Sequence, residues 1–406
     1  MKHTEILLPT QKRRLPLVCK IIYVMTFVSA VLYVAFTLHS GFADWFNRTV
    51  SPIGRAALAS LTNLIPFSVG EWIIIVIPIL LVLLISIAYR HFADTWRDSF
   101  LYIGMLFSGI CVILFLFVWN FAAGYYAPPL DQKLQIDRTE VSAEELGDTA
   151  EWLADEIKAL TDEIVFLPSG ESLMPYSYTE MNQKLMDAYR KACEKYDFID
   201  RFSSSVKPIM LSHPMSYTHV TGVYTFFTGE ANLNVNFPDY TLPYTAAHEL
   251  AHQRGVARED EANFVAFLVC MESDDPYIRY SAYLNVYEYV AAALARTDPD
   301  RYRVLYQTLP YEVIAEQAAY RVFFEKYREN VAASVTQATN DTYLKVQGAK
   351  EGTRSYNMVV DLSVAYYRAY CKDETRPKES YKGLAIKFRI FRMRRGGSLS
   401  LLGATL

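Results

Sequence analysis

Two histidines and a glutamate that could form a metal site lie within five consecutive residues, His248-Glu249-Leu250-Ala251-His252. Residues four apart lie on one face of a helix, so both imidazoles could bind the same metal ion. Glu249 could then sit beside a metal-bound water and take its proton. Small and apolar residues surround the motif, which predicts a buried helix, and buried polar side chains need a partner such as a metal. We therefore predict a zinc site with His248 and His252 as ligands and Glu249 as the catalytic base.

A third ligand downstream of this motif has to be a carboxylate. A zinc hydrolase needs three protein ligands and an open position, and no histidine follows His252 in the sequence. The longer motif HExxHxxGxxH would place its third histidine at position 258, where the chain has arginine. The remaining candidates are Glu259, Asp260 and Glu261.

Among these carboxylates we favour Glu261, because it opens a mostly apolar stretch that should form a buried helix. Asn263, two residues later, could support the ligand through a hydrogen bond. Glu259 is the alternative ligand. In the simpler interpretation, Glu259 and Asp260 only complement the dipole at the N-terminus of this helix.

The residues before the motif predict a small β-sheet that could bind substrate. Short β-rich runs separated by turn residues cover 206–211, 222–228 and 231–237. Many zinc peptidases bind substrate as a strand added to the edge strand before this helix, here 224–228 or 231–236. Polar candidates near such a cleft are Glu230, Asn232 and Asn234. The alternative is that these residues only build the sheet.

A donor that stabilises an oxyanion should complete the site. The candidates are Tyr280, Tyr283, Tyr320 and Arg321. Since the chain has 30 tyrosines, a place in the core or on the surface is the simpler interpretation for each of them. Tyr280 is kept with Glu230, Asn232 and Asn263 as a candidate for substrate binding or ligand support.

The composition indicates a membrane protein. The 406 residues carry a net charge of −4, so there is no bulk basic character to suggest nucleic-acid binding. Hydrophobic residues make up 52% and concentrate near the N-terminus. Apolar runs at 17–38, 72–89 and 100–123 are each long enough to cross a bilayer. A cleaved signal peptide is the competing interpretation of the first run, but two more spans follow it.

Basic residues near the spans predict their orientation in the cytoplasmic membrane. Those that precede or open the first span are Lys2, Lys12, Arg13, Arg14 and Lys20. The loop 39–70 has only Arg48 and Arg55, whereas the short loop around Arg90 and Arg97 is denser in charge. We therefore expect a cytoplasmic N-terminus and an extracytoplasmic chain from about residue 125. The five cysteines show no CxxC pairing and predict neither a disulfide framework nor a cysteine zinc site.

The expected fold class is α+β and mainly helical. A membrane domain with three transmembrane helices covers 1–124, a zincin-like metallopeptidase domain with a small sheet covers 125–380, and a basic tail covers 381–406. Segment 56–67 should be an apolar loop at the membrane or against the spans, and 125–134 a linker. The tail is either solvated or in contact with anionic lipid or wall polymers. Further helices are expected at 142–160, 179–196, 259–271, 278–295, 311–329 and 356–370.

The motif and its surroundings resemble the gluzincin branch of zinc metallopeptidases, in which a glutamate on a second helix is the third ligand. More closely, the layout is similar to a bacterial family of zinc-dependent membrane metallopeptidases. The similar features are the three spans, Ser68-Val69-Gly70-Glu71, Thr228-Gly229-Glu230-Ala231-Asn232, Tyr343-Leu344-Lys345 and Ser355-Tyr356. The resemblance implies His248, His252 and Glu261 as zinc ligands and Glu249 as the catalytic residue. It implies no particular substrate.

These observations predict a membrane-anchored zinc metallopeptidase that hydrolyses amide bonds of a peptide or protein outside the cytoplasm. One alternative is hydrolysis of peptidoglycan amide bonds in the cell wall. Another is a non-enzymatic surface or adaptor protein stabilised by a metal, although such a site would not need Glu249. An intramembrane protease is disfavoured, because charged residues follow the motif closely and no apolar span contains it.

Overall fold

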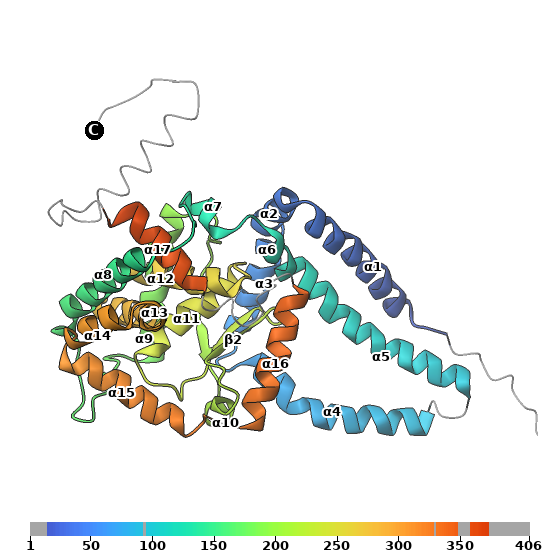
Figure 1. Cartoon of the computed structure of the whole chain (residues 1–406). Helices are drawn as coiled ribbons and strands as arrows, with labels where there is room; N and C mark the ends of the chain where they lie inside the picture. The colour runs from blue at the N-terminus through green and yellow to red at the C-terminus, as the bar shows by residue number, and fades with distance from the viewer. Residues whose placement is uncertain (1–13, 92–94, 329, 348–357, 373–406) are drawn as a thin grey trace, which may run out of the picture.

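The computed structural model describes residues 14–91, 95–328, 330–347 and 358–372. The fold is mostly helical with one small sheet, as Figure 1 shows. Long apolar helices extend from one side of a compact bundle that contains the sheet. The expected tail at 381–406 and the Ser355-Tyr356 feature lie outside the described residues.

Three helices are long and apolar enough to cross a membrane, which associates the chain with a lipid bilayer. They are α1 (Leu17–Leu38), α4 (Val69–His91) and α5 (Trp96–Phe117). The last continues through a π-helix, η1 (Val118–Ala122), into α6 (Ala123–Tyr126). Helix α4 and the continuous helix from α5 to α6 are longer than the apolar runs that predicted them, because their polar ends remain helical.

The segment between the first two spans forms two helices, α2 (Ser40–Thr49) and α3 (Ser51–Asn63), and the second half of α3 covers most of 56–67, where an apolar loop was expected. This segment is not a loop at the surface, because Arg55 of α3 is fully buried and held by several partners. Its guanidinium binds Asp200 at 2.7 Å, the Asn47 side chain at 2.8 Å and the Asn120 carbonyl at 3.0 Å. These contacts join α3 to η1 and to the bundle across the expected boundary at residue 124.

The expected linker at 125–134 is part of the folded core. It contains α6 and α7 (Leu130–Leu134), and Leu130 and Leu134 are buried in the main hydrophobic cluster. Arg258, the residue just before the helix that follows the motif, also donates to the carbonyls of Tyr125 and Ala127 at 2.8 Å. The chain that leaves the third span is therefore fixed by its buried leucines and by the hydrogen bonds from Arg258.

The bundle is built from amphipathic helices with the local signals that the sequence contains. A capping box at Ser142 and Glu145 starts α8, as predicted. The observed bounds follow the predicted ones closely for α8 (Ala143–Thr161), α9 (Tyr178–Lys195), α12 (Glu259–Met271), α13 (Pro276–Thr297), α15 (Tyr311–Glu325) and α17 (Val359–Tyr370). Helices not predicted are α10 (Ser212–Ser216), α14 (Pro299–Gln307) and α16 (Val331–Val346).

The sheet has three strands in the order β1-β3-β2. They are β1 (Val206–Pro208), β2 (Gly222–Thr225) and β3 (Glu230–Leu233), each shorter than its predicted run. The central strand β3 is fully buried. It pairs in parallel with β1 and antiparallel with β2. One edge of the sheet is therefore β2. All five cysteines are free.

Candidate metal site

The HELAH motif lies on a buried helix, α11 (Thr241–Gln253), in which every residue is buried. Pro243 occupies its first turn, where a missing backbone N–H costs nothing. Gly255 ends the helix with φ +86°, a conformation that glycine adopts without strain. The predicted buried helix and its glycine cap are confirmed.

Three possible ligand atoms converge beside α11. The Nε2 atoms of His248 and His252 lie 3.4 and 3.3 Å from Oε2 of Glu259. These atoms all lie within 4.8 Å of one another. The two imidazole rings are perpendicular, with centroids 4.5 Å apart. The cluster thus joins two residues of α11 to the first residue of α12.

The carboxylate that completes the cluster is Glu259. Glu261, which we favoured as the third ligand, does not lie with the two histidines. Glu261 Oε1 instead accepts hydrogen bonds from the Leu130 backbone at 2.9 Å and from Arg258 at 2.8 Å. The intervening Asp260 binds Arg138 at 3.0 Å. The three consecutive carboxylates diverge because each step along a helix turns the side chain by about 100°. Since α12 begins at Glu259, this residue faces the histidines.

A backbone hydrogen bond orients one histidine for metal binding. Nδ1 of His252 lies 2.7 Å from the Val256 carbonyl, which can only accept, so Nδ1 carries a proton, and in the neutral imidazole the Nε2 lone pair would be free to bind a metal. Such support of the second ring nitrogen is typical of metal-bound histidines. Nδ1 of His248 is buried without a protein partner.

Asn263 lies one turn after Glu259 on α12, and its Nδ2 is also buried without a partner. The Tyr244 hydroxyl, one turn before His248, donates to the Asn263 carbonyl at 3.0 Å. The two helices therefore face each other at this level. If the oxygen and nitrogen of the Asn263 amide exchanged places, an acceptor oxygen would replace the unpaired Nδ2.

Glu249 faces the edge strand β2. A Cβ on Gly222 would lie 2.6 Å from Oε1 of Glu249, so only glycine lets the strand come this close. Burial raises the pKa of the Glu249 carboxyl, and the nearby His248 and His252 partly offset that rise. The Tyr224 backbone also hydrogen-bonds to this carboxylate.

The charges of the cluster are strongly coupled. Burial alone would lower the pKa of His252, but the charge and hydrogen bond of Glu259 outweigh it and raise the pKa to about 9. The same interaction holds the pKa of Glu259 well below its usual range, against its own burial. The proton on His252 compensates the negative charge of Glu259. A cation bound by two neutral imidazoles would compensate the same charge. Two imidazole nitrogens and one carboxylate oxygen are also a usual zinc donor set, so the residues present fit the metal.

The end of the third span forms one wall of the site. The Phe121 ring of η1 packs edge-on against the His252 ring, with centroids 5.9 Å apart. From α6, the Tyr125 hydroxyl donates to the Tyr343 hydroxyl of α16 at 3.1 Å. Burial and, less strongly, the charge of Glu259 raise the pKa of Tyr343 to about 12. Tyr343 was not among the predicted oxyanion donors. Its segment, Tyr343-Leu344-Lys345, was one of the features that resemble the peptidase family.

Glu230 has another role than substrate binding in this structure. Its carboxylate accepts the Val69 and Gly70 backbone N–H groups at 3.0 and 2.9 Å and binds the buried Lys207 at 2.6 Å. It therefore caps the N-terminus of α4. Glu71 completes this junction by accepting the Met210 and Leu211 backbone N–H groups at 2.9 and 2.7 Å. Two of the family-like segments thus form one contact between the second span and the sheet.

The other predicted polar residues also serve the fold. Asn232 donates to the Val223 carbonyl at 3.1 Å, and Asn234 to the Val220 carbonyl at 3.0 Å. Tyr280 donates to Glu316 at 2.5 Å, so its hydroxyl is engaged away from the histidines. Tyr283 packs on Phe267 in the core. Tyr320 and Arg321 line a separate hollow of about 250 Å³.

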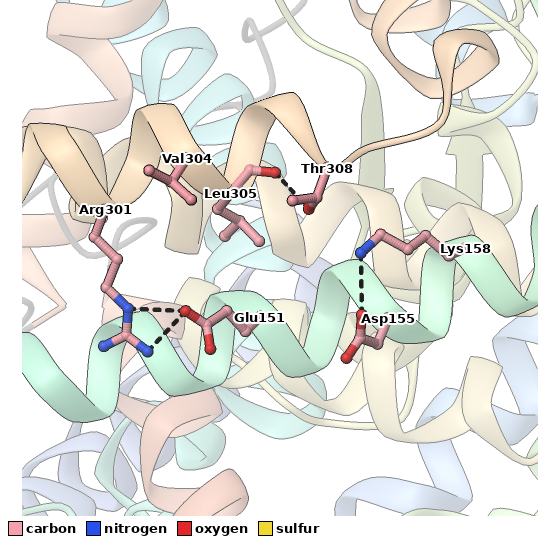
Figure 2. Close-up of a pocket in the computed structure, with 7 residues that line it drawn as sticks. All are labelled: Glu151, Asp155, Lys158, Arg301, Val304, Leu305 and Thr308. Carbon is pink, nitrogen blue, oxygen red and sulfur yellow. Dashed lines mark hydrogen bonds and ion pairs between the residues drawn. The ribbon is translucent and has the colours of Figure 1, made fainter.

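A second hollow of about 260 Å³ lies between α8 and α14, apart from the metal cluster (Figure 2). Figure 2 shows Arg301 reaching from α14 to Glu151 on α8, while Lys158 pairs with Asp155 on the same helix. Arg301 also binds Asp148 at 2.7 Å. These ion pairs join two helices and leave no unpaired charge to bind a ligand among the residues drawn.

Comparison with known proteins places this chain in a family. Residues 46–364 match the family model described as "Protein of unknown function (DUF3810)". The chain belongs to this family. The DUF3810 match begins in α2, ends in α17 and includes two of the three apolar helices together with the histidine cluster. No curated protein and no solved structure matches the chain.

Proposed function

We propose that this DUF3810 protein is a membrane-anchored, zinc-dependent peptidase. The observation that carries the proposal is the convergence of three ligand atoms, from His248, His252 and Glu259, next to the buried carboxylate of Glu249. A structural metal site would need the ligands alone. The additional carboxylate beside an edge strand is what a hydrolase requires.

His248, His252 and Glu259 would hold the zinc ion. Zinc bound there would supply a Lewis acid that makes water nucleophilic near neutral pH and polarises an amide carbonyl. Glu249 would accept a proton from the attacking water and pass it to the amine nitrogen as the C–N bond breaks. The net reaction consumes one water and yields a carboxylic acid and an amine.

The edge strand β2 would position the peptide. Gly222 lies against Glu249, so the backbone of a peptide paired with β2 would pass close to this carboxylate. In the antiparallel ladder, the backbone groups of Gly222 and Tyr224 face away from β3, and the Tyr224 N–H already hydrogen-bonds to Glu249. The remaining groups, those of Gly222 and the Tyr224 carbonyl, favour an extended peptide over a branched glycan as the substrate.

The proposed location of the site is outside the cytoplasm. Arg90 and Arg97 flank the connection between α4 and α5, which favours the cytoplasmic face for that end of both helices. The opposite ends of α4 and α5 lead to the sheet and the histidines. The N-terminus and the site would then lie on opposite sides of the membrane.

The test compares the full-length protein with its Glu249→Gln variant in lipid nanodiscs. Zinc content is measured by atomic absorption, and hydrolysis is measured with a peptide library and, separately, with peptidoglycan fragments. We expect both proteins to hold zinc and the variant to lose activity by at least about 100-fold. Cleavage of peptides is expected, with little cleavage of the peptidoglycan fragments.

Chelation of zinc from the wild-type protein should abolish the same activity, and zinc should restore it. Equal hydrolysis by wild type and Glu249→Gln would refute the mechanism. A wild-type protein that retains zinc but cleaves neither substrate would instead support a metal-stabilised binding protein.

A further inference from the structure

The second span, α4, contacts the third span near Tyr102 and is otherwise largely exposed. None of the residues in its apolar window is buried, and Ile79, Leu80, Leu81 and Val82 are between 45% and 69% exposed. Because these four residues are consecutive, they point to all sides of the helix. By contrast, α1 and α5 form a pair, with the Thr26 hydroxyl 3.3 Å from the Cys111 carbonyl. Within the described residues, no protein side chain therefore buries the apolar stretch Ile79 to Val82 of α4.

The space between α4 and α5 is wedge-shaped. The two helices touch at one end, where the Tyr102 hydroxyl donates to the Leu84 carbonyl at 2.6 Å. They diverge towards the bundle, and Figure 1 shows α16 standing at the wide end of the wedge. In a bilayer, an apolar opening of this kind contains acyl chains, since water and polar groups are excluded from it.

The edge strand β2 connects the candidate metal site to the wide end of this wedge. Its first residue, Gly222, lies against Glu249. Its last residue, Thr225, contacts Gly70 at the start of α4, with atoms as near as 3.1 Å to a Cβ built there. The next residue, Phe226, packs against Phe117 at the end of α5, with ring centroids 5.2 Å apart. A peptide bound along β2 would therefore run from Glu249 to the gap between the two spans.

The depth of the site in the membrane agrees with this route. The helix from α5 to α6 has 31 residues, which is about 46 Å, whereas the hydrocarbon core is about 30 Å thick. About 20 residues on from Arg97, the helix leaves the core near Phe117. The Phe121 ring, one turn further, already touches His252. Four residues rise by about 6 Å, so the histidine cluster would lie at the level of the lipid headgroups.

We propose that the substrate is a peptide anchored in the outer leaflet by an acyl chain, which enters the wedge between α4 and α5 while the peptide pairs with β2. The four residues of β2 span about 14 Å, so the anchor would be attached about four residues from the cleaved bond. A transmembrane helix is a poorer fit, because α4 and α5 meet at Tyr102 and Leu84 and close the wedge across the other leaflet. This inference rests on the proposed peptidase function.

Gly109 of α5 provides a way to block the wedge without disturbing the fold. It lies seven residues after Tyr102, hence on the same face of α5, which is the face that contacts α4. A Cβ at Gly109 would meet no atom within 4 Å. A tryptophan at this position would therefore project into open space in the wedge. Gly41 of α2 has equally open surroundings and provides the matched control.

The experiment uses the full-length protein in nanodiscs and one fluorogenic peptide in several forms. The forms are unmodified, palmitoylated at either end with a spacer of about four or about twenty residues, and fused to a transmembrane helix. We expect kcat/KM to be at least tenfold higher for one short-spacer palmitoyl form than for its long-spacer counterpart. Gly109→Trp should remove most of this preference while cleaving the unmodified peptide normally, and Gly41→Trp should behave as wild type.

The outcomes separate this inference from the proposed function. Equal kcat/KM for all forms, or an unchanged preference in Gly109→Trp, would overturn the acyl-anchor inference while leaving the peptidase intact. Preferred cleavage of the transmembrane form would also overturn it. Failure of the proposed function would appear differently, as activity that Glu249→Gln does not reduce or as no cleavage of any form.

Discussion

At the scale of single residues, the site depends on which carboxylate faces the two histidines. Glu259, Asp260 and Glu261 have almost the same chemistry, and their different partners follow from the position at which α12 begins. Glu259 is the residue within reach of both Nε2 atoms, whereas Glu261 supports the chain leaving the third span. The two residues should therefore respond differently to the same substitution.

Replacement of Glu259 by glutamine should weaken zinc binding by at least about 100-fold, since even residues that only support a ligand commonly contribute 10- to 100-fold. Glu261→Gln is the matched control, because glutamine keeps an oxygen that can accept the Leu130 N–H. We expect the control to hold as much zinc as wild type. Zinc affinity is measured by competition with a chromogenic chelator. Equal losses in both variants would contradict the assignment of Glu259.

At the scale of elements, the bundle is fastened by contacts between helices that are distant in sequence. Arg368 of α17 binds Glu145 of α8 at 2.7 Å and donates to the Asp137 carbonyl at 3.0 Å. The hydrogen bond from Arg368, with that from Ser142, lowers the pKa of Glu145 to about 2. The docking of α17 on α8 should consequently depend on pH.

Because the folded-state pKa of Glu145 is depressed, its contribution to stability is fully present above about pH 4.5 and is lost as the pH falls towards 2. Glu145→Gln retains the capping oxygen but removes the charge. It should lower the free energy of unfolding by about 1 kcal/mol near pH 7, a value reduced by solvent screening. We expect the difference from wild type, measured by thermal unfolding, to shrink between pH 5 and pH 3. The exposed Glu144→Gln should show no such dependence.

At the scale of the whole molecule, the apolar helices and the bundle form one structural unit. Arg55 between the first two spans reaches Asp200 in the bundle, and Asn47 donates to the Gly255 carbonyl at the end of the motif helix at 3.1 Å. Gly124 lies so close to this carbonyl that a Cβ would be 2.6 Å from it. The site is therefore built on the membrane helices as much as on the bundle.

Arg55→Met should destabilise the whole protein by about 3–5 kcal/mol, because it leaves the buried Asp200 without its partner. Adding Asp200→Asn should restore part of this loss. Arg48→Met provides the control, since its ion pair with Asp197 is exposed and should contribute less than about 1 kcal/mol. Thermal unfolding in detergent micelles measures all four proteins. A small effect of Arg55→Met, similar to that of Arg48→Met, would show that the membrane helices and the bundle are independent.

The sequence by itself determined the features that depend on local periodicity and caps. The HELAH helix, the glycine at its end, the helix that begins at Glu259 and the three apolar helices all follow from residues close together in the chain. Only the tertiary structure decided which carboxylate meets the histidines, because the direction of a side chain depends on how α12 lies against α11. It also decided that Glu230 caps α4 from 160 residues away and that Tyr343 meets Tyr125 at the end of the third span. Such contacts have no local pattern, since they arise when distant buried polar groups must find partners.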